Sequence, residues 1–273
     1  IITGGIDLAV GSLVAFCGAA AMIALNHFAS SGDTNAILFA FFAAIATGTA
    51  CGFLNGTLIA YGRVAPFVVT LAGLAGYRSF ALVLGDGGEI RSKVPFFQEI
   101  GFGGIAIPGV KNAGGGAVYL YWSAIVFFAV ALLAGFILNR TRWGRHIIAV
   151  GANEKAAHYS AINVNWVKVR VYTLLGCLVG LAAFFNAARM NSVGTGSVGL
   201  YYELDAIAAV VIGGTTLRGG KGRIWGTVVG VLLLTLISYM MTAYNIDTDW
   251  QGLVKGSVIL IAVLLQRGSK STG

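Results

Sequence analysis

Residues 36–62 read AILFAFFAAIATGTACGFLNGTLIAYG, and this stretch contains no charged side chain. A helix needs about 20 consecutive apolar residues to cross the hydrocarbon core of a bilayer. An uncharged apolar run of this length is typical of a membrane span and is too long for a buried strand. The stretch therefore predicts a helix that crosses a membrane.

Runs of the same kind recur along the chain, and we count eight expected spans. They are residues 8–26, 36–62, 64–85, 117–139, 171–188, 206–217, 224–246 and 253–266. The run 206–217 is too short to cross alone and would need residues from the loop before it. The sequence therefore predicts an all-α fold, a polytopic transmembrane helical bundle that forms one membrane domain over residues 1–273.

The composition agrees with this class. Hydrophobic residues make up 57% of the chain and charged residues 10%, whereas soluble domains carry about 25% charged residues. The 40 glycines also fit, because glycine is frequent in membrane helices and lets neighbouring helices approach closely. The chain opens at Ile1 in a glycine-rich turn, which favours a fragment whose N-terminal part is missing.

The basic residues lie in loops between the apolar runs. Residues 140–170 contain six lysines and arginines against one acidic residue, Glu154. Cytoplasmic loops of membrane proteins carry such an excess of positive charge, so we place this loop in the cytoplasm and the stretch 86–116 outside. The net charge of +8 is thereby explained, and a nucleic-acid partner is not expected.

No motif points to catalysis, a metal or a bound nucleotide. The three cysteines each lie inside an apolar run, and the three histidines are scattered, so we expect no metal site and no disulfide. The turn at Gly220 and Lys221 fails the phosphate-loop pattern at Thr215 and Gly222. The GTGSVG stretch at 194–199 has no preceding strand, so we read it as a loop rather than a dinucleotide-binding turn.

A short helix is expected inside the basic loop, over the sequence GANEKAAHYS at 151–160. Asn153 is suited to cap its N-terminus, and Glu154 lies favourably in the first turn. The small residues Ala156 and Ala157 would let another surface approach closely. Two interpretations stay open: a contact with a partner protein, or a helix lying on anionic lipid.

Two glycine turns resemble one another, GGIDLAVG at 4–11 and GGTTLRGG at 213–220, and each precedes an apolar run. An internal repeat and a chance match are both open. Transporters use glycine-broken helices to line their pathways. The residues that we assign to the pathway are Gly4, Gly5, Asp7, Asn55, Gly213, Gly214, Gly219 and Gly220. For Asn55, hydrogen bonding between helices is the expected role beside this assignment.

Four charged residues lie at or near the outer ends of expected spans: Arg78, Arg189, Glu203 and Asp205. Ionisable groups at membrane depth usually face a cavity or pair with each other. For Arg189 with Glu203 or Asp205, an ion pair and a role in the pathway are both open.

Four blocks of the chain resemble the ribose/xylose-type sugar permeases of ATP-binding cassette (ABC) transporters. The segment GGIDLAVGS at 4–12 is similar to that family's GGIDLSVGS signature, with Ala9 in place of the usual Ser. The other blocks are 55–67, 144–164 and 202–227, and the last is the most specific. Ala161 stands where the family usually has Gly, and the outer stretch 86–116 diverges from the family.

The resemblance implies a permease of about ten spans in its full form, working as a pair of identical chains in the inner membrane of a bacterium. It also implies a cytoplasmic ABC ATPase and an extracytoplasmic sugar-binding protein as partners, besides membrane lipid. ATP and Mg would bind to the ATPase, and no cofactor to this chain. The short helix would be the coupling helix that docks on the ATPase, and the residues assigned to that contact are Gly151, Asn153, Glu154, Ala156, Ala157 and Ser160.

The expected function is therefore the import of a monosaccharide, driven by ATP hydrolysed on partner subunits, with no enzyme activity of the chain's own. A permease of the same superfamily for branched-chain amino acids or nucleosides is one alternative. A stand-alone secondary transporter is another, although such a carrier needs ion-coupling acids in its spans, and Asp7 is the only acid near a broken helix.

Overall fold

The computed structural model describes residues 1–111, 116–247, 250, 252–254 and 256–257. These residues form two compact units, each assembled from separate parts of the chain. One unit holds residues 7–130 and 168–200, and the other holds residues 1–6, 131–167 and the chain from 201 onward. The expectation of a single permease domain over 1–273 stays a prediction.

Six helices within the described part of the chain are long and apolar enough to cross a membrane. They are α1 (Val10–His27), α2 (Asp33–Ala60), α3 (Pro66–Leu84), α5 (Trp122–Arg140), α8 (Val164–Met190) and α10 (Ile224–Ala243). Each contains most of one of the expected apolar runs, which confirms the helical membrane fold. Proline at the first position of α3 suits a helix start, because proline has no N–H to leave unpaired there.

Two expected spans have a different outcome. The run 206–217 forms the helix α9 (Tyr202–Ile212) of 11 residues, which is about 16 Å long and too short to cross. The helix takes in four residues from the preceding loop and ends before Gly213, and the expected crossing of this run stays a prediction. The run 253–266 lies largely outside the described residues.

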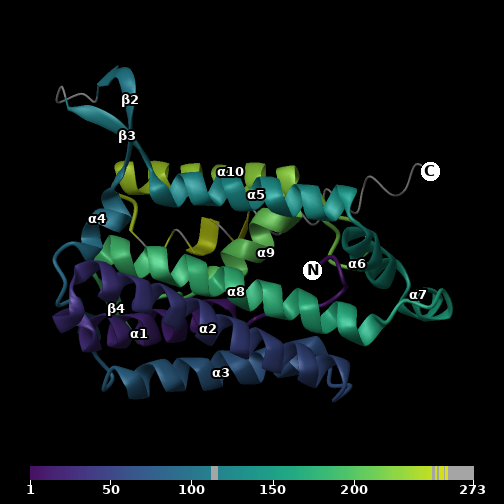
Figure 1. Cartoon of the computed structure of the whole chain (residues 1–273). Coiled ribbons are helices and arrows are strands. Elements are labelled where there is room, and N and C mark those ends of the chain that lie inside the picture. The colour runs from purple at the N-terminus through teal and green to yellow at the C-terminus, as the bar shows by residue number, and fades with distance from the viewer. Residues whose placement is uncertain (112–115, 248–249, 251, 255, 258–273) are drawn as a thin grey trace. The chain divides into compact units, whose positions relative to one another are not determined.

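The core of the first unit is built around α1. Figure 1 shows α1 beside α2 and α3, and both pack against it. Of the six spans α1 is the most buried, with 61% of its residues inside the protein, against 17% for α5. The short helix η1 (Ala29–Ser31) joins α1 to α2.

Glycines bring α2 and α8 into backbone contact. Gly48 lies directly against Gly176, and a side chain on Gly52 would overlap the carbonyl oxygen of Tyr172. Gly56 meets the backbone of Val169 in the same way. The spacing of four residues between Gly48, Gly52 and Gly56 places all three on one face of α2, as in membrane helices that associate through small residues. The sequence shows the glycines, but not which helix they face.

We expect Gly52→Ala to destabilise this contact, because the added methyl group would meet backbone atoms that cannot rotate away. Overpacking of this kind costs about 1–3 kcal/mol. Thermal unfolding of the protein in lipid nanodiscs measures the loss. Gly76→Ala in α3 is the matched control, since nothing lies within 4 Å of the place that its methyl group would take. Equal melting temperatures for both variants would contradict the packing described here.

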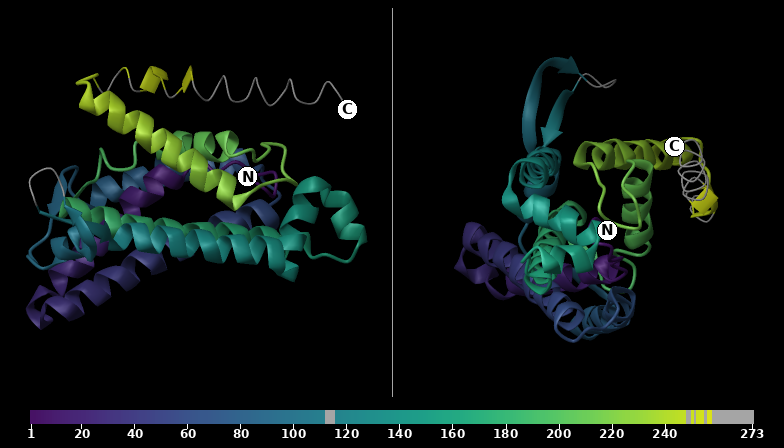
Figure 2. Two further views of the ribbon diagram at one scale, coloured as in Figure 1. Left: turned by 90° about the horizontal axis from the view of Figure 1, so that it is seen from above. Right: turned by 90° about the vertical axis from the view of Figure 1, so that its right-hand side faces the viewer.

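Residues 86–111 contain two strands and a short helix that hydropathy does not predict. Strand β1 (Glu89–Arg91) pairs antiparallel with β4 (Ser192–Gly194), and α4 (Phe97–Phe102) follows β1. Strands β2 (Gly104–Lys111) and β3 (Ala117–Tyr121) form a hairpin that projects from the helices of its unit (Figure 2). The expected span 117–139 accordingly becomes helical only at Trp122.

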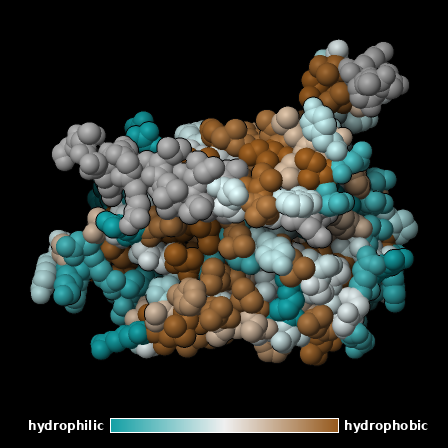
Figure 3. All heavy atoms as spheres, turned by 180° about the vertical axis from the view of Figure 1, so that it is seen from behind, coloured by the Kyte–Doolittle hydropathy of each residue, from teal (hydrophilic) through white to brown (hydrophobic). Residues whose placement is uncertain are grey.

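Large hydrophobic side chains remain exposed on the membrane helices. Leu133 and Phe136 of α5 are each 60% exposed, and Val83 of α3 is 73% exposed. Apolar side chains cover much of the face shown in Figure 3. An apolar surface of this extent fits a protein whose solvent is lipid rather than water.

Candidate functional site

The basic loop folds into two helices, α6 (Arg142–Ala152) and α7 (Glu154–Tyr159). The hydroxyl of Thr141 caps α6 by accepting a hydrogen bond from the Gly144 N–H at 3.2 Å. The side chain of Asn153 caps α7 by accepting one from the Ala156 N–H at 3.0 Å. The short helix and its asparagine cap are confirmed, whereas α6 was not expected from the sequence.

Helix α7 presents one of its two central alanines to the surroundings. Ala156 is exposed and Tyr159 is 90% exposed, whereas Ala157 is only 4% exposed. The methyl group of Ala157 therefore packs within the chain, and its assignment to a partner contact stays a prediction. Ser160 ends the helix by donating its N–H to the Ala156 carbonyl.

Ala161, the position at which the sequence departs from the resembled family, lies in the turn after α7. Ala161 has a φ of +59°, a conformation that glycine adopts freely and other residues adopt at a cost of about 1–2 kcal/mol. This chain makes the backbone turn that ends α7 with alanine, where a glycine would adopt the same φ without that cost.

The two glycine turns meet each other. The Gly220 N–H donates a hydrogen bond of 2.8 Å to the Ile2 carbonyl. A side chain on Gly219 would come within 2.8 Å of the Gly4 nitrogen. Gly4, Gly219 and Gly220 all have positive φ, between +73° and +84°, so the crossing needs glycine both for its backbone angles and for its space.

The same crossing includes the C-terminal end of α6. A side chain on Gly151 would overlap the Ile2 carbonyl oxygen and lie 2.6 Å from the Gly220 nitrogen. A side chain on Gly220 would lie 2.6 Å from the Ala152 Cα. We call the backbone crossing of residues 2–4, 151–152 and 219–220 the glycine junction. The glycine junction brings Gly4, Gly219 and Gly220, which were assigned to the pathway, against Gly151, which was assigned to the coupling segment. It lies directly before Asn153, the cap of α7.

Gly213 and Gly214 occupy different surroundings. A side chain on Gly213 would overlap the backbone of Gly226 at the start of α10, whereas nothing lies within 4 Å of such a position at Gly214. Gly230 packs in turn on the backbone of Ala209 in α9. Gly213 therefore holds α9 against α10, and of the two glycines only Gly214 faces open space.

Two other residues assigned to the pathway have structural partners. Asn55 is 3% exposed and accepts a hydrogen bond of 2.7 Å from the Tyr77 hydroxyl, which links α2 to α3. The interhelical role expected for Asn55 is thus confirmed. Asp7 accepts a hydrogen bond of 2.8 Å from the Ala9 N–H just before α1 begins. Such a contact at a helix start satisfies one of the amide groups that lack a partner in the helix.

The four charged residues expected at the outer ends of spans fall into two groups, Arg78 and Arg189 in one unit and Glu203 and Asp205 in the other. Arg78 lies within α3 and donates hydrogen bonds to the carbonyls of Thr195 at 2.9 Å and Val198 at 2.7 Å. It therefore holds the loop after β4 against α3. Arg189, in the last turn of α8, lies over the ring of Phe102 at 5.9 Å from the centroid.

Glu203 and Asp205 lie in the first turn of α9, where acidic groups interact favourably with the helix dipole. They belong to one unit and Arg189 to the other, so the ion pair between them stays a prediction.

A further charged contact secures the β1–β4 pair. The pKa of the Glu89 carboxyl is lowered because it accepts hydrogen bonds from the side chains of Ser192 and Arg91. Of the residues described, no three His, Cys, Asp or Glu side chains gather in a way that could hold a metal ion.

Comparison with known proteins identifies the family of this chain. Residues 1–263 match the sequence model of the family described as "Branched-chain amino acid transport system / permease component". The chain is 40% identical to the ribose import permease protein RbsC of Escherichia coli (strain K12), over 97% of this chain and 78% of the relative. It is 39% identical to RbsC of Bacillus subtilis (strain 168), over 98% and 78%.

A third relative is the xylose transport system permease protein XylH of Haemophilus influenzae, 32% identical over 99% of this chain and 84% of the relative. No solved structure gives a significant match. The protein is a multi-pass inner-membrane permease with six described helices long enough to cross. The chain therefore belongs to the branched-chain amino acid transport system / permease component family, and its resemblance to the ribose/xylose-type sugar ABC permeases is confirmed.

Proposed function

We propose that this chain forms the membrane pathway of an ABC importer for a monosaccharide. The observation that carries the proposal is the 40% identity to a ribose import permease over 97% of the chain. Two copies of the chain would enclose the pathway, ATP would be hydrolysed on cytoplasmic ABC ATPase subunits, and an extracytoplasmic binding protein would deliver the sugar. The excess of positive charge in residues 140–170 supports placing α6 and α7 on the cytoplasmic side.

The glycine junction supplies a physical route from the ATPase to the membrane. A partner that moves α7 would also move the end of α6, because only Asn153 separates the two helices. The end of α6 lies in backbone contact with both glycine turns, and one of these turns precedes α10. Backbone contacts transmit displacement without loss through side-chain rotation. Since coupling between two sites is reciprocal, a change of the pathway would act back on α7 in the same way.

The open side of Gly214 is the place where we expect the solute to approach the chain. Its φ of +84° and its empty surroundings give a bare backbone turn at the end of a helix too short to span. Broken helices that end within a membrane offer backbone groups to polar solutes. A hydroxyl-rich, uncharged sugar can use such groups as donors and acceptors.

Reconstitution tests the proposal. We expect uptake of ribose, xylose, arabinose or galactose into lipid vesicles only when the chain, its ATPase, its binding protein and ATP are all present. Leucine and a nucleoside are the comparison solutes, because the family description names branched-chain amino acids. Uptake of leucine or the nucleoside in place of every sugar would assign the chain to that branch of the superfamily. Uptake by the chain without an ATPase would show a stand-alone secondary transporter.

A further inference from the structure

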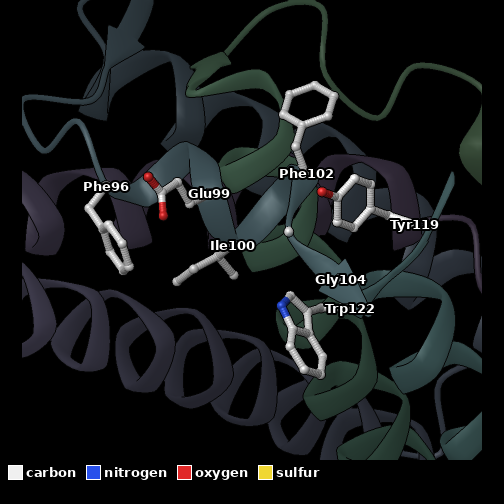
Figure 4. Close-up of a pocket in the computed structure, with 8 residues that line it drawn as sticks. Phe96, Glu99, Ile100, Phe102, Gly104, Tyr119 and Trp122 are labelled. Atoms are coloured by element: carbon white, nitrogen blue, oxygen red, sulfur yellow. The ribbon is translucent and has the colours of Figure 1, made fainter. Parts of the chain in front are cut away.

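A pocket of about 570 Å³ lies beside α4, at the foot of the β2–β3 hairpin. Figure 4 shows Phe96 and Glu99 at one side of it and Tyr119 and Trp122 at the other, with Ile100 between them. Phe102, Gly103 and Gly104 complete the lining. Four of the eight lining residues are aromatic, and each of these four is between 44% and 48% exposed. The pocket therefore offers several ring faces that no other side chain covers completely.

Backbone contacts hold the walls of the pocket in place. The Gly103 N–H donates to the Glu99 carbonyl at 2.6 Å, and the Trp122 N–H donates to the Gly103 carbonyl at 3.0 Å. A side chain on Gly101 would overlap the backbone of Arg189 at the last turn of α8. The helix that carries Glu99 and the start of the helix that carries Trp122 are thus fixed to each other and to α8. A pocket with such walls is formed before any ligand arrives.

The position of the pocket along α8 is informative. Arg189 lies in the last turn of this 27-residue helix, about 40 Å from the end that follows the basic loop. A helix of this length spans the bilayer, so the pocket, at the last turn of α8, lies across the membrane from the start of that helix. In an importer with the proposed function, sugar enters from this side of the membrane.

The charges around the pocket select the kind of ligand. The exposed carboxylate of Glu99 lines it, which disfavours an anion and a lipid acyl chain. The guanidinium of Arg189 lies over the ring of Phe102, which disfavours a second cation on the same ring. An uncharged polyol suits this lining, because its hydroxyls can donate to the Glu99 carboxylate. The C–H faces of its ring can pack on the aromatic faces.

We propose that this pocket binds a monosaccharide weakly at the entry side of the permease, with the sugar ring against Trp122 and Tyr119 and its hydroxyls on Glu99. The proposal rests on the proposed function, because it names a binding site for the solute that the permease would import. An aromatic belt at the membrane interface would account for exposed tryptophan and tyrosine alone. It does not account for a carboxylate within a concave site whose walls are fixed by backbone hydrogen bonds.

Saturation-transfer NMR on the full chain in lipid nanodiscs, without binding protein or ATPase, tests the site. This measurement detects weakly bound sugars through the ring protons that touch the protein. We expect transfer to at least one of ribose, xylose, arabinose and galactose. The transfer should fall about tenfold in Tyr119→Ala and in Glu99→Ala, each of which removes one ligand contact. Tyr121→Ala is the matched control, because Tyr121 is an exposed tyrosine of the same strand that does not line the pocket.

The remaining outcomes overturn the proposal in distinguishable ways. If the sugar signals are absent or equal in all variants while the reconstituted importer takes up sugar, the pocket does not bind sugar. The proposed function is unaffected by that result. Transfer to butylammonium, a mimic of the lysine side chain, in place of every sugar would assign the pocket to a basic group of a partner. A wild-type chain that neither binds nor transports any of the four sugars would overturn the proposed function and this site with it.

Discussion

Gly151→Ala is expected to reduce sugar uptake about 100-fold while the protein remains in the membrane, because the glycine junction has no room for a methyl group. The added carbon would overlap the Ile2 carbonyl oxygen and lie 2.6 Å from the Gly220 nitrogen. Both are backbone atoms, so no side-chain rotation can relieve the overlap. The end of α6 and the two glycine turns would have to separate.

The variant should also show how the junction acts. If the junction carries motion between α7 and the pathway, the Gly151→Ala chain keeps its ATPase partner but no longer links hydrolysis to uptake. We would measure uptake and ATP hydrolysis in the same vesicles, and compare the amount of chain in the membrane by immunoblot. Gly135→Ala in α5 is the matched control, since its added carbon would meet its nearest neighbour, Ile224, at an ordinary 4.0 Å. Normal uptake by the Gly151 variant would show that the junction does not couple the two elements.

Ala156→Glu is expected to weaken association with the ATPase about 100-fold and to abolish uptake with it. Ala156 is exposed in α7, so the substitution does not disturb the packing of the chain itself, and glutamate is a good helix former. At a closely packed contact the new carboxylate would be desolvated without a partner, which costs several kcal/mol. Ala157→Glu is less informative, because Ala157 is 4% exposed and a charge there would disrupt α7 directly.

Co-purification with the ATPase and ATP hydrolysis stimulated by the binding protein are the measurements. Ala156→Ser serves as the control, because it keeps the side chain small and uncharged and should leave both nearly unchanged. If the Ala156→Glu chain retains its ATPase and its stimulated turnover, α7 is not the docking helix. In that case the alternative interpretation of α7, as a helix lying on anionic lipid, would gain support.

The features that depend on local sequence could be predicted. The uncharged run 36–62 became α2 at Asp33–Ala60, because a helix of that length satisfies its own backbone hydrogen bonds in lipid. Asn153 caps α7 as expected, since a capping side chain bonds to an amide only three residues away. The expected failure of 206–217 to span alone also followed from its length.

Other features depend on residues far apart in the chain and could not be predicted in this way. The pairing of β1 with β4 joins Ile90 to Val193, although two helices long enough to span the membrane, α5 and α8, lie between them in the chain. No periodicity in either segment predicts the partner. The burial of Ala157 beside the exposed Ala156 has the same origin, because two adjacent alanines look alike in sequence and only packing separates them.

The sequence by itself determined that this chain is a helical membrane protein, which way its basic loop is expected to face and which permease family it resembles. These properties follow from hydropathy, charge and short motifs, each of which acts within a few turns of helix. The tertiary structure alone decided what the glycines do. Gly151, Gly219 and Gly4 meet in one crossing, Gly213 packs on Gly226, and Gly214 faces open space. A glycine has no side chain to indicate its neighbour, so its role is set entirely by the backbone that folding brings against it.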